Sequence, residues 1–135
     1  MKYLYHGSIT QNLKKLEPRK RYTPAGKIDY SAIYATPLPA YAAAHSFPWS
    51  TDEGVGLDVS ENGVDLFIPN KFKSRLQVPI SIYKISAESF LRTKEEETGY
   101  TWHATIPIDV IEEKKYSSVE VALRELGARL EYIEK

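Results

Sequence analysis

The chain contains no cysteine, which excludes disulfides, thiolate catalysis and cysteine-based zinc sites. Its three histidines are widely separated in the sequence, so no metal site is predicted. No apolar run approaches the roughly 20 residues that a membrane-spanning helix requires. The first residues also lack the long apolar stretch of a signal peptide. These absences predict a cytoplasmic protein without a metal and without a membrane segment.

An excess of one charge sign is also missing. The 135 residues include 18 Lys and Arg and 18 Asp and Glu, which gives a formal net charge of zero. Proteins that bind nucleic-acid backbones usually carry a basic excess, so a general role of that kind is disfavoured. We interpret the basic run between Lys14 and Arg21 as a solvated loop. The length and the 42% apolar content fit a single domain over residues 1–135.

Short apolar and aromatic runs separated by Gly and Pro predict an α+β fold. Strands are expected at 2–6, 31–35, 55–59, 64–68, 78–85, 100–104, 110–114 and 130–133. A helical turn is expected at 10–17, and a basic loop at 69–77. Thr36 is the predicted N-cap of a helix over residues 40–47. Ser117 and Glu120 form a predicted capping box for a second helix, which ends at Gly127.

Two short motifs in the first third of the chain carry side chains suited to a ligand. In the first, His6 ends a strand and is followed by Gly7 and Ser8. Glycine lets a ligand approach the backbone closely, and the His and Ser side chains can hydrogen-bond a ribose or a phosphate. In the second, small residues flank Tyr34, which leaves its ring open to a planar group such as nicotinamide. Taken alone, the first motif also fits an ordinary turn at the end of a strand, and the second also fits a tyrosine packed in the core.

As a pair, Tyr5-His6-Gly7-Ser8 and Ala32-Ile33-Tyr34-Ala35-Thr36, followed by an Ala-rich helix, resemble motifs of the ADP-ribosyltransferase superfamily. The similar branch is the His-Tyr-Glu branch, which includes diphtheria toxin and the poly(ADP-ribose) polymerases. The resemblance implies an α+β fold with a small split antiparallel β-sheet and flanking short helices. It also implies NAD as the substrate. His6 would hold the adenosine ribose, Gly7 would bind the nicotinamide amide through its backbone, and Tyr34 would stack on the nicotinamide.

The resemblance implies further contacts with bound NAD. Ser8 would shape the floor of the site, and Thr36, which ends the tyrosine motif, is a further expected cofactor-binding residue. In the polymerases an aromatic ring from the next helix covers the other face of the nicotinamide. Tyr41, His45 and Phe47 are the candidates for that ring, and His45 has the closest spacing.

The third residue of the family is a glutamate on a later strand, which stabilises an oxocarbenium-like transition state. The segment Leu130-Glu131-Tyr132-Ile133 is similar to the corresponding motif of the polymerases. Glu131 is therefore the predicted catalytic carboxylate, together with His6 and Tyr34. Two other placements compete with it. One is the acidic run Glu95, Glu96 and Glu97, and the other is the strand in which Thr101 or His103 would replace the glutamate.

The resemblance thus implies an enzyme that releases nicotinamide from NAD and transfers ADP-ribose to an acceptor. The sequence leaves the acceptor open: it is a protein, a nucleic acid or a small molecule. It also leaves open whether the enzyme is a toxin or has a housekeeping role, and what its oligomeric state is. One alternative is a catalytically degenerate module of the same fold that binds NAD or another nucleotide. Another is an RNA 2′-phosphotransferase-like enzyme that uses Arg19, Arg21 and His45.

Overall fold

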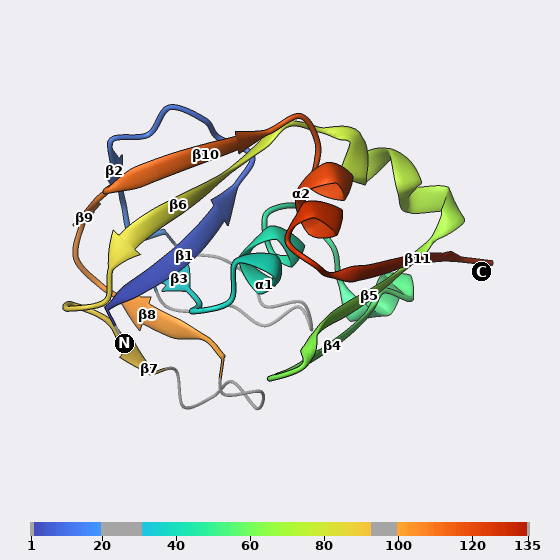
Figure 1. Cartoon of the computed structure of the whole chain (residues 1–135), viewed down its shortest axis with the longest axis horizontal. Helices are drawn as coiled ribbons and strands as arrows, with labels where there is room; N and C mark the ends of the chain where they lie inside the picture. The colour runs from blue at the N-terminus through green and yellow to red at the C-terminus, as the bar shows by residue number, and fades with distance from the viewer. Residues whose placement is uncertain (1, 20–30, 93–99, 135) are drawn as a thin grey trace.

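A computed structural model describes residues 2–19, 31–92 and 100–134 and shows an α+β protein built mostly from short strands (Figure 1). Its main antiparallel sheet consists of β1 (Tyr3–Ser8), β6 (Ile80–Ser86) and β10 (Glu112–Tyr116), with β6 in the centre. Strand β6 is apolar on both sides. Ile80 and Ile82 belong to one hydrophobic core, whereas Tyr83 and Ile85 belong to another. Both faces of this sheet are therefore covered.

Two short helices, α1 (Pro39–Ala44) and α2 (Val119–Glu125), lie between the main sheet and a second sheet (Figure 1). The second sheet has the order β11 (Arg129–Ile133), β5 (Gly63–Pro69) and β4 (Gly56–Ser60). Strands β4 and β5 form the predicted antiparallel hairpin, whose turn places Gly63 at a φ of 139°.

Strand β11 runs parallel to β5, which differs from the expected wholly antiparallel sheet. The chain reaches β11 through α2, and a helical crossover of this kind is the connection that parallel strands require. The expectation of antiparallel pairing is therefore wrong for this pair. The α+β class and a predominance of small antiparallel sheets are confirmed.

Two smaller sheets cover the other face of the main sheet. One pairs β2 (Lys15–Leu16) with β9 (Ile108–Asp109). The other has the order β3 (Ile33–Ala35), β8 (Trp102–Ala104) and β7 (Leu91–Arg92). Backbone hydrogen bonds in both directions between Tyr5 and Thr36, of 2.7 and 3.0 Å, hold the end of β3 against β1. The two motif-bearing strands are therefore neighbours.

Two local predictions fail for identifiable reasons. Residues 10–17 are not helical, because Asn12 adopts a left-handed φ of 67° and Leu16 pairs in β2 with only 3% of its surface exposed. Residues 69–77 are not an irregular loop. They contain the 3₁₀-helix η2 (Asn70–Gln77), which buries Leu76 completely. A second short 3₁₀-helix, η1 (Thr51–Glu53), follows the α1 segment.

The predicted helix caps are displaced. The N-cap of α1 is Leu38, and Thr36 instead accepts a hydrogen bond from the Leu38 amide at 3.2 Å. Helix α1 ends at Ala44 rather than near residue 47. The N-cap of α2 is Ser118, whose Oγ accepts from the Val121 amide at 3.0 Å, so the capping box predicted at Ser117 is wrong by one residue. None of the described helices is long and apolar enough to cross a membrane.

Candidate functional site

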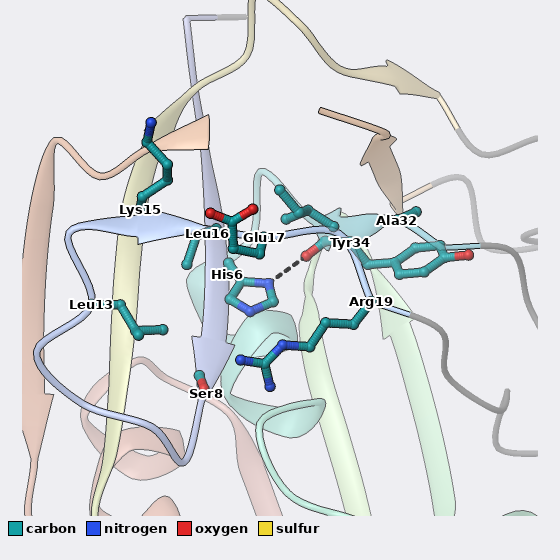
Figure 2. Close-up of a pocket in the computed structure, with 10 residues that line it drawn as sticks. His6, Ser8, Leu13, Lys15, Leu16, Glu17, Arg19, Ala32 and Tyr34 are labelled. Carbon is teal, nitrogen blue, oxygen red and sulfur yellow. Dashed lines mark hydrogen bonds between the residues drawn. The ribbon is translucent and has the colours of Figure 1, made fainter. Parts of the chain in front are cut away.

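A cavity of about 230 Å³ lies on the face of β1 that carries His6 and Ser8 (Figure 2). Tyr34 lines it from β3, and charged side chains line it from the segment that crosses β1. We call this segment, residues 10–19, the strap. The strap contributes Lys15, Glu17 and Arg19 to the cavity wall. The two sequence motifs thus meet at one hollow in the surface.

A hydrogen bond fixes the orientation of the His6 ring. Nδ1 of His6 lies 2.7 Å from the carbonyl oxygen of Tyr34, which comes from the neighbouring strand (Figure 2). A carbonyl oxygen only accepts, so this contact assigns the hydrogen to Nδ1 and makes Nε2 an acceptor in the neutral ring. The ring also lies beside Tyr83 of β6, with centroids 6.5 Å apart. An acceptor nitrogen held in this way suits a ligand hydroxyl.

The outer half of the strap is attached to the protein at two places. Leu16 is buried and pairs with Ile108 in the β2–β9 sheet. Farther along, Arg19 and Ala32 exchange backbone hydrogen bonds of 3.3 and 3.1 Å. Because the backbone is held at both places, the charged side chain of Glu17 between them is kept at the rim of the cavity.

The inner half of the strap is held by a polar network from the main sheet. Tyr83 Oη donates to the Thr10 carbonyl at 2.6 Å. The carboxylate of Glu113 accepts from the Asn12 amide at 2.8 Å and from Ser81 Oγ at 2.6 Å. Burial alone would raise the pKa of Glu113, but these donated hydrogen bonds outweigh it and hold the pKa below its ordinary value. Burial raises the pKa of Tyr83, which remains a protonated donor.

Gly7 faces away from the cavity and toward helix α1. A Cβ at this position would lie 2.2 Å from the backbone oxygen of Ala42 and 3.0 Å from Cβ of Ser46. The glycine therefore allows α1 to pack directly on β1. The nicotinamide contact implied for its backbone stays a prediction.

The other residues expected to bind NAD lie outside the wall of this cavity. Thr36 is buried, and its hydroxyl accepts from the backbone of the turn before α1. His45 is the C-cap of α1, with its ring edge-to-face against Tyr41 at 4.6 Å and 5.5 Å from Trp49. Figure 2 shows the Tyr34 ring pointing away from His6, and its centroid lies 6.4 Å from that of His103.

The candidates for the third catalytic residue separate in space. Glu131 lies on β11, in the second sheet, where Arg129 donates to it at 2.6 Å, and it does not line the cavity. His103 lies on β8 directly opposite Tyr34, and Thr101 precedes that strand. Glu95, Glu96 and Glu97 lie outside the described residues, as does Arg21.

The cavity wall includes Lys15 and Glu17, which the sequence reasoning missed as site residues. The signal was present in the alternation of Lys15, Glu17 and Arg19 around the apolar Leu16. In an extended segment, successive side chains point to opposite sides, so residues two apart lie on the same side. The three charged residues therefore share one side, as is typical of a strand. The prediction of a helical turn over residues 10–17 concealed this pattern.

A second cavity of about 170 Å³ lies on the opposite face of β1, with Tyr5, Lys84 and Lys114 in its wall.

In the described part of the chain, no three His, Asp or Glu side chains cluster closely enough to hold a metal ion. No family model matches the chain, and no curated protein or solved structure matches it either.

Proposed function

We propose that the chain binds NAD beside His6 and transfers its ADP-ribose to an acceptor, with release of nicotinamide. The observation that carries this proposal is the meeting of His6 and Tyr34, 28 residues apart, at one cavity with a 2.7 Å hydrogen bond between them. These are the residues that the two sequence motifs single out. Nearby cations make the same cavity suitable for a ligand that contains phosphate.

Two polar groups in the cavity wall have defined tasks in this proposal. Nε2 of His6 accepts from a ribose hydroxyl, and the guanidinium of Arg19 pairs with the pyrophosphate. The cavity of about 230 Å³ is smaller than the roughly 300–1,000 Å³ of most ligand pockets. It therefore takes the ribose-phosphate part of NAD, and the nicotinamide lies beyond it, against the ring of Tyr34.

The reaction requires no metal. The bond between the ribose anomeric carbon and the nicotinamide nitrogen breaks, and its electron pair leaves with neutral nicotinamide. The ribosyl group carries positive charge in the transition state, which a nearby carboxylate would stabilise. A nucleophilic atom of the acceptor then forms a bond to the anomeric carbon and loses its proton.

Replacement of the histidine tests the binding part of the proposal. His6→Ala is expected to weaken NAD binding by roughly two- to tenfold, since it removes a hydrogen bond worth about 0.5–1.5 kcal/mol. Isothermal titration calorimetry measures this change. Lys114→Ala is the control, because Lys114 lines the second cavity and should leave NAD affinity unchanged. Equal NAD affinity in His6→Ala and the wild type would show that NAD does not bind at this histidine.

A second candidate function is an NAD-binding module that performs no transfer. The position of Glu131 favours it, because this carboxylate lies on β11 and outside the cavity wall. For the transfer function, we expect NAD to release nicotinamide at the same rate in Glu131→Gln and in the wild type. Chromatography of the released nicotinamide gives both rates.

Three results of this assay are distinguishable. Release that is unaffected by Glu131→Gln supports transfer with a stabilising group other than Glu131. A sharp loss of release in the variant, with binding retained, would identify Glu131 as the catalytic carboxylate despite its place on β11. If the wild type binds NAD but releases no nicotinamide, the transfer function with NAD as the substrate would be ruled out. That result would favour the NAD-binding module.

A further inference from the structure

Opposite charges lie on either side of His6 in the cavity. In the view of Figure 2 the Glu17 carboxylate lies on one side of the His6 ring, and the Arg19 guanidinium lies on the other. Both side chains come from the strap, two residues apart, and both are exposed. A ligand that contacts His6 therefore meets an anion at one side and a cation at the other.

Within the described part of the chain, neither charge is neutralised by an ion pair. Lys15, in the same strap, pairs with Asp109 at 3.6 Å, whereas Glu17 and Arg19 have no side-chain partner among the described residues. Burial of Leu16 and the backbone bonds between Arg19 and Ala32 hold the strap at these positions. The strap backbone is thus held at the cavity, and both charged side chains are exposed in its wall.

The two groups suit different parts of a nucleotide. A carboxylate accepts hydrogen bonds from the two adjacent hydroxyls of a ribose, and it repels a phosphate ester at the 2′ position. A guanidinium forms paired hydrogen bonds with phosphate oxygens. If the ribose of a nucleotide lies beside His6 and the attached pyrophosphate lies toward Arg19, the ribose hydroxyls would face Glu17.

We propose that Glu17 makes the site selective for NAD over NADP, by binding the diol of the adenosine ribose while Arg19 binds the pyrophosphate. This inference rests on the proposed NAD-binding function. Repulsion contributes to the discrimination between NAD and NADP, because the negatively charged 2′-phosphate of NADP would lie against the Glu17 carboxylate. The same arrangement accepts ADP-ribose, which has the same diol and pyrophosphate as NAD.

The test compares three proteins by calorimetric titration with NAD, NADP and ADP-ribose. The wild type is expected to bind NAD roughly tenfold or more tightly than NADP, as repulsion between charges a few ångströms apart predicts. Glu17→Gln should bring the two affinities within about a factor of two or three, mainly through tighter NADP binding. Arg19→Gln should lower the affinity for all three ligands by similar factors, so that the ratio of NAD to NADP affinity is retained.

Two further variants make the result specific. Glu112→Gln removes a carboxylate from the second cavity, and it should leave all affinities unchanged. Glu17→Asp keeps the charge, and it should retain the preference for NAD. Thermal unfolding of each variant checks that the exposed substitutions leave the fold intact.

Failure of the selectivity and failure of the proposed function give different results. Equal affinities of the wild type for NAD and NADP, or an unchanged ratio in Glu17→Gln, would overturn the role of Glu17 and leave NAD binding in place. A wild type that binds neither dinucleotide nor ADP-ribose at millimolar concentration would overturn both the selectivity and the proposed function.

Discussion

Gly7→Ala is expected to lower the free energy of unfolding by about 2–3 kcal/mol, at the upper end of overpacking costs. The added Cβ would lie 2.2 Å from the backbone oxygen of Ala42 and 2.9 Å from its carbonyl carbon. These are backbone atoms of α1, so no side-chain rotation relieves the overlap. Either α1 or β1 must move, which disturbs contacts in the core beneath the helix. Chemical denaturation followed by circular dichroism measures the loss.

Gly56→Ala is the matched control for this prediction. Gly56 also lies in a strand, but a Cβ there would first meet Cδ2 of Phe67 at 3.5 Å, which is an ordinary contact. The stability of this variant should equal or slightly exceed that of the wild type, because alanine restricts the unfolded chain. Similar losses in both variants would show that α1 does not pack on Gly7 as described.

Glu113→Ala is expected to destabilise the protein by about 2 kcal/mol, because removing the acceptor of a buried donor costs about 1–3 kcal/mol. Ser81 is completely buried and donates to this carboxylate, as does the amide of Asn12. Without Glu113 the strap keeps the Tyr83 bond to Thr10 and the contact between Lys115 Nζ and Asn12 Oδ1, but the Asn12 amide loses its acceptor. Faster hydrogen exchange at the Asn12 amide should therefore accompany the loss in stability.

The effect of Glu113 should depend on pH. Its pKa is lower in the folded protein than the ordinary value of 4.5, so its contribution is complete above that value and is lost as pH falls through the lower folded pKa. The stability difference between the wild type and Glu113→Ala should thus narrow in acid. Glu112→Ala, at the exposed neighbour in β10, should not show this loss of stability. A constant difference from pH 7 to pH 3 would contradict this role for Glu113.

The sequence predicted those features that depend on local patterns. Asn62 and Gly63 indicated the β4–β5 hairpin, because the glycine tolerates the positive φ of the turn. The apolar run ending at Ile85 indicated a buried strand, and β6 is the centre of the main sheet. The two motifs also predicted that His6 and Tyr34 belong to one NAD site. That site stays a prediction, and the structure places both residues in the wall of one cavity.

The remaining features depend on contacts that a local pattern does not contain. Leu13 and Leu16 are three residues apart, which matches helical spacing, but Leu16 is buried by pairing with Ile108, far along the chain. The strap and its charged residue Glu17 were therefore missed. Glu131 was selected by its neighbours in the sequence. Its distance from His6 follows from the parallel pairing of β11 with β5, which places it in another sheet.

The most direct test of NAD binding at the His6 cavity is an NMR titration of the isotopically labelled protein with NAD. We expect amide shifts to cluster at residues that line the cavity from β1, the strap and β3: His6, Ser8, Glu17, Arg19 and Tyr34. Lys84 and Lys114, in the second cavity on the opposite face of β1, should remain unshifted. Shifts centred on that second cavity, or no shifts at millimolar NAD, would contradict the claim that NAD binds beside His6.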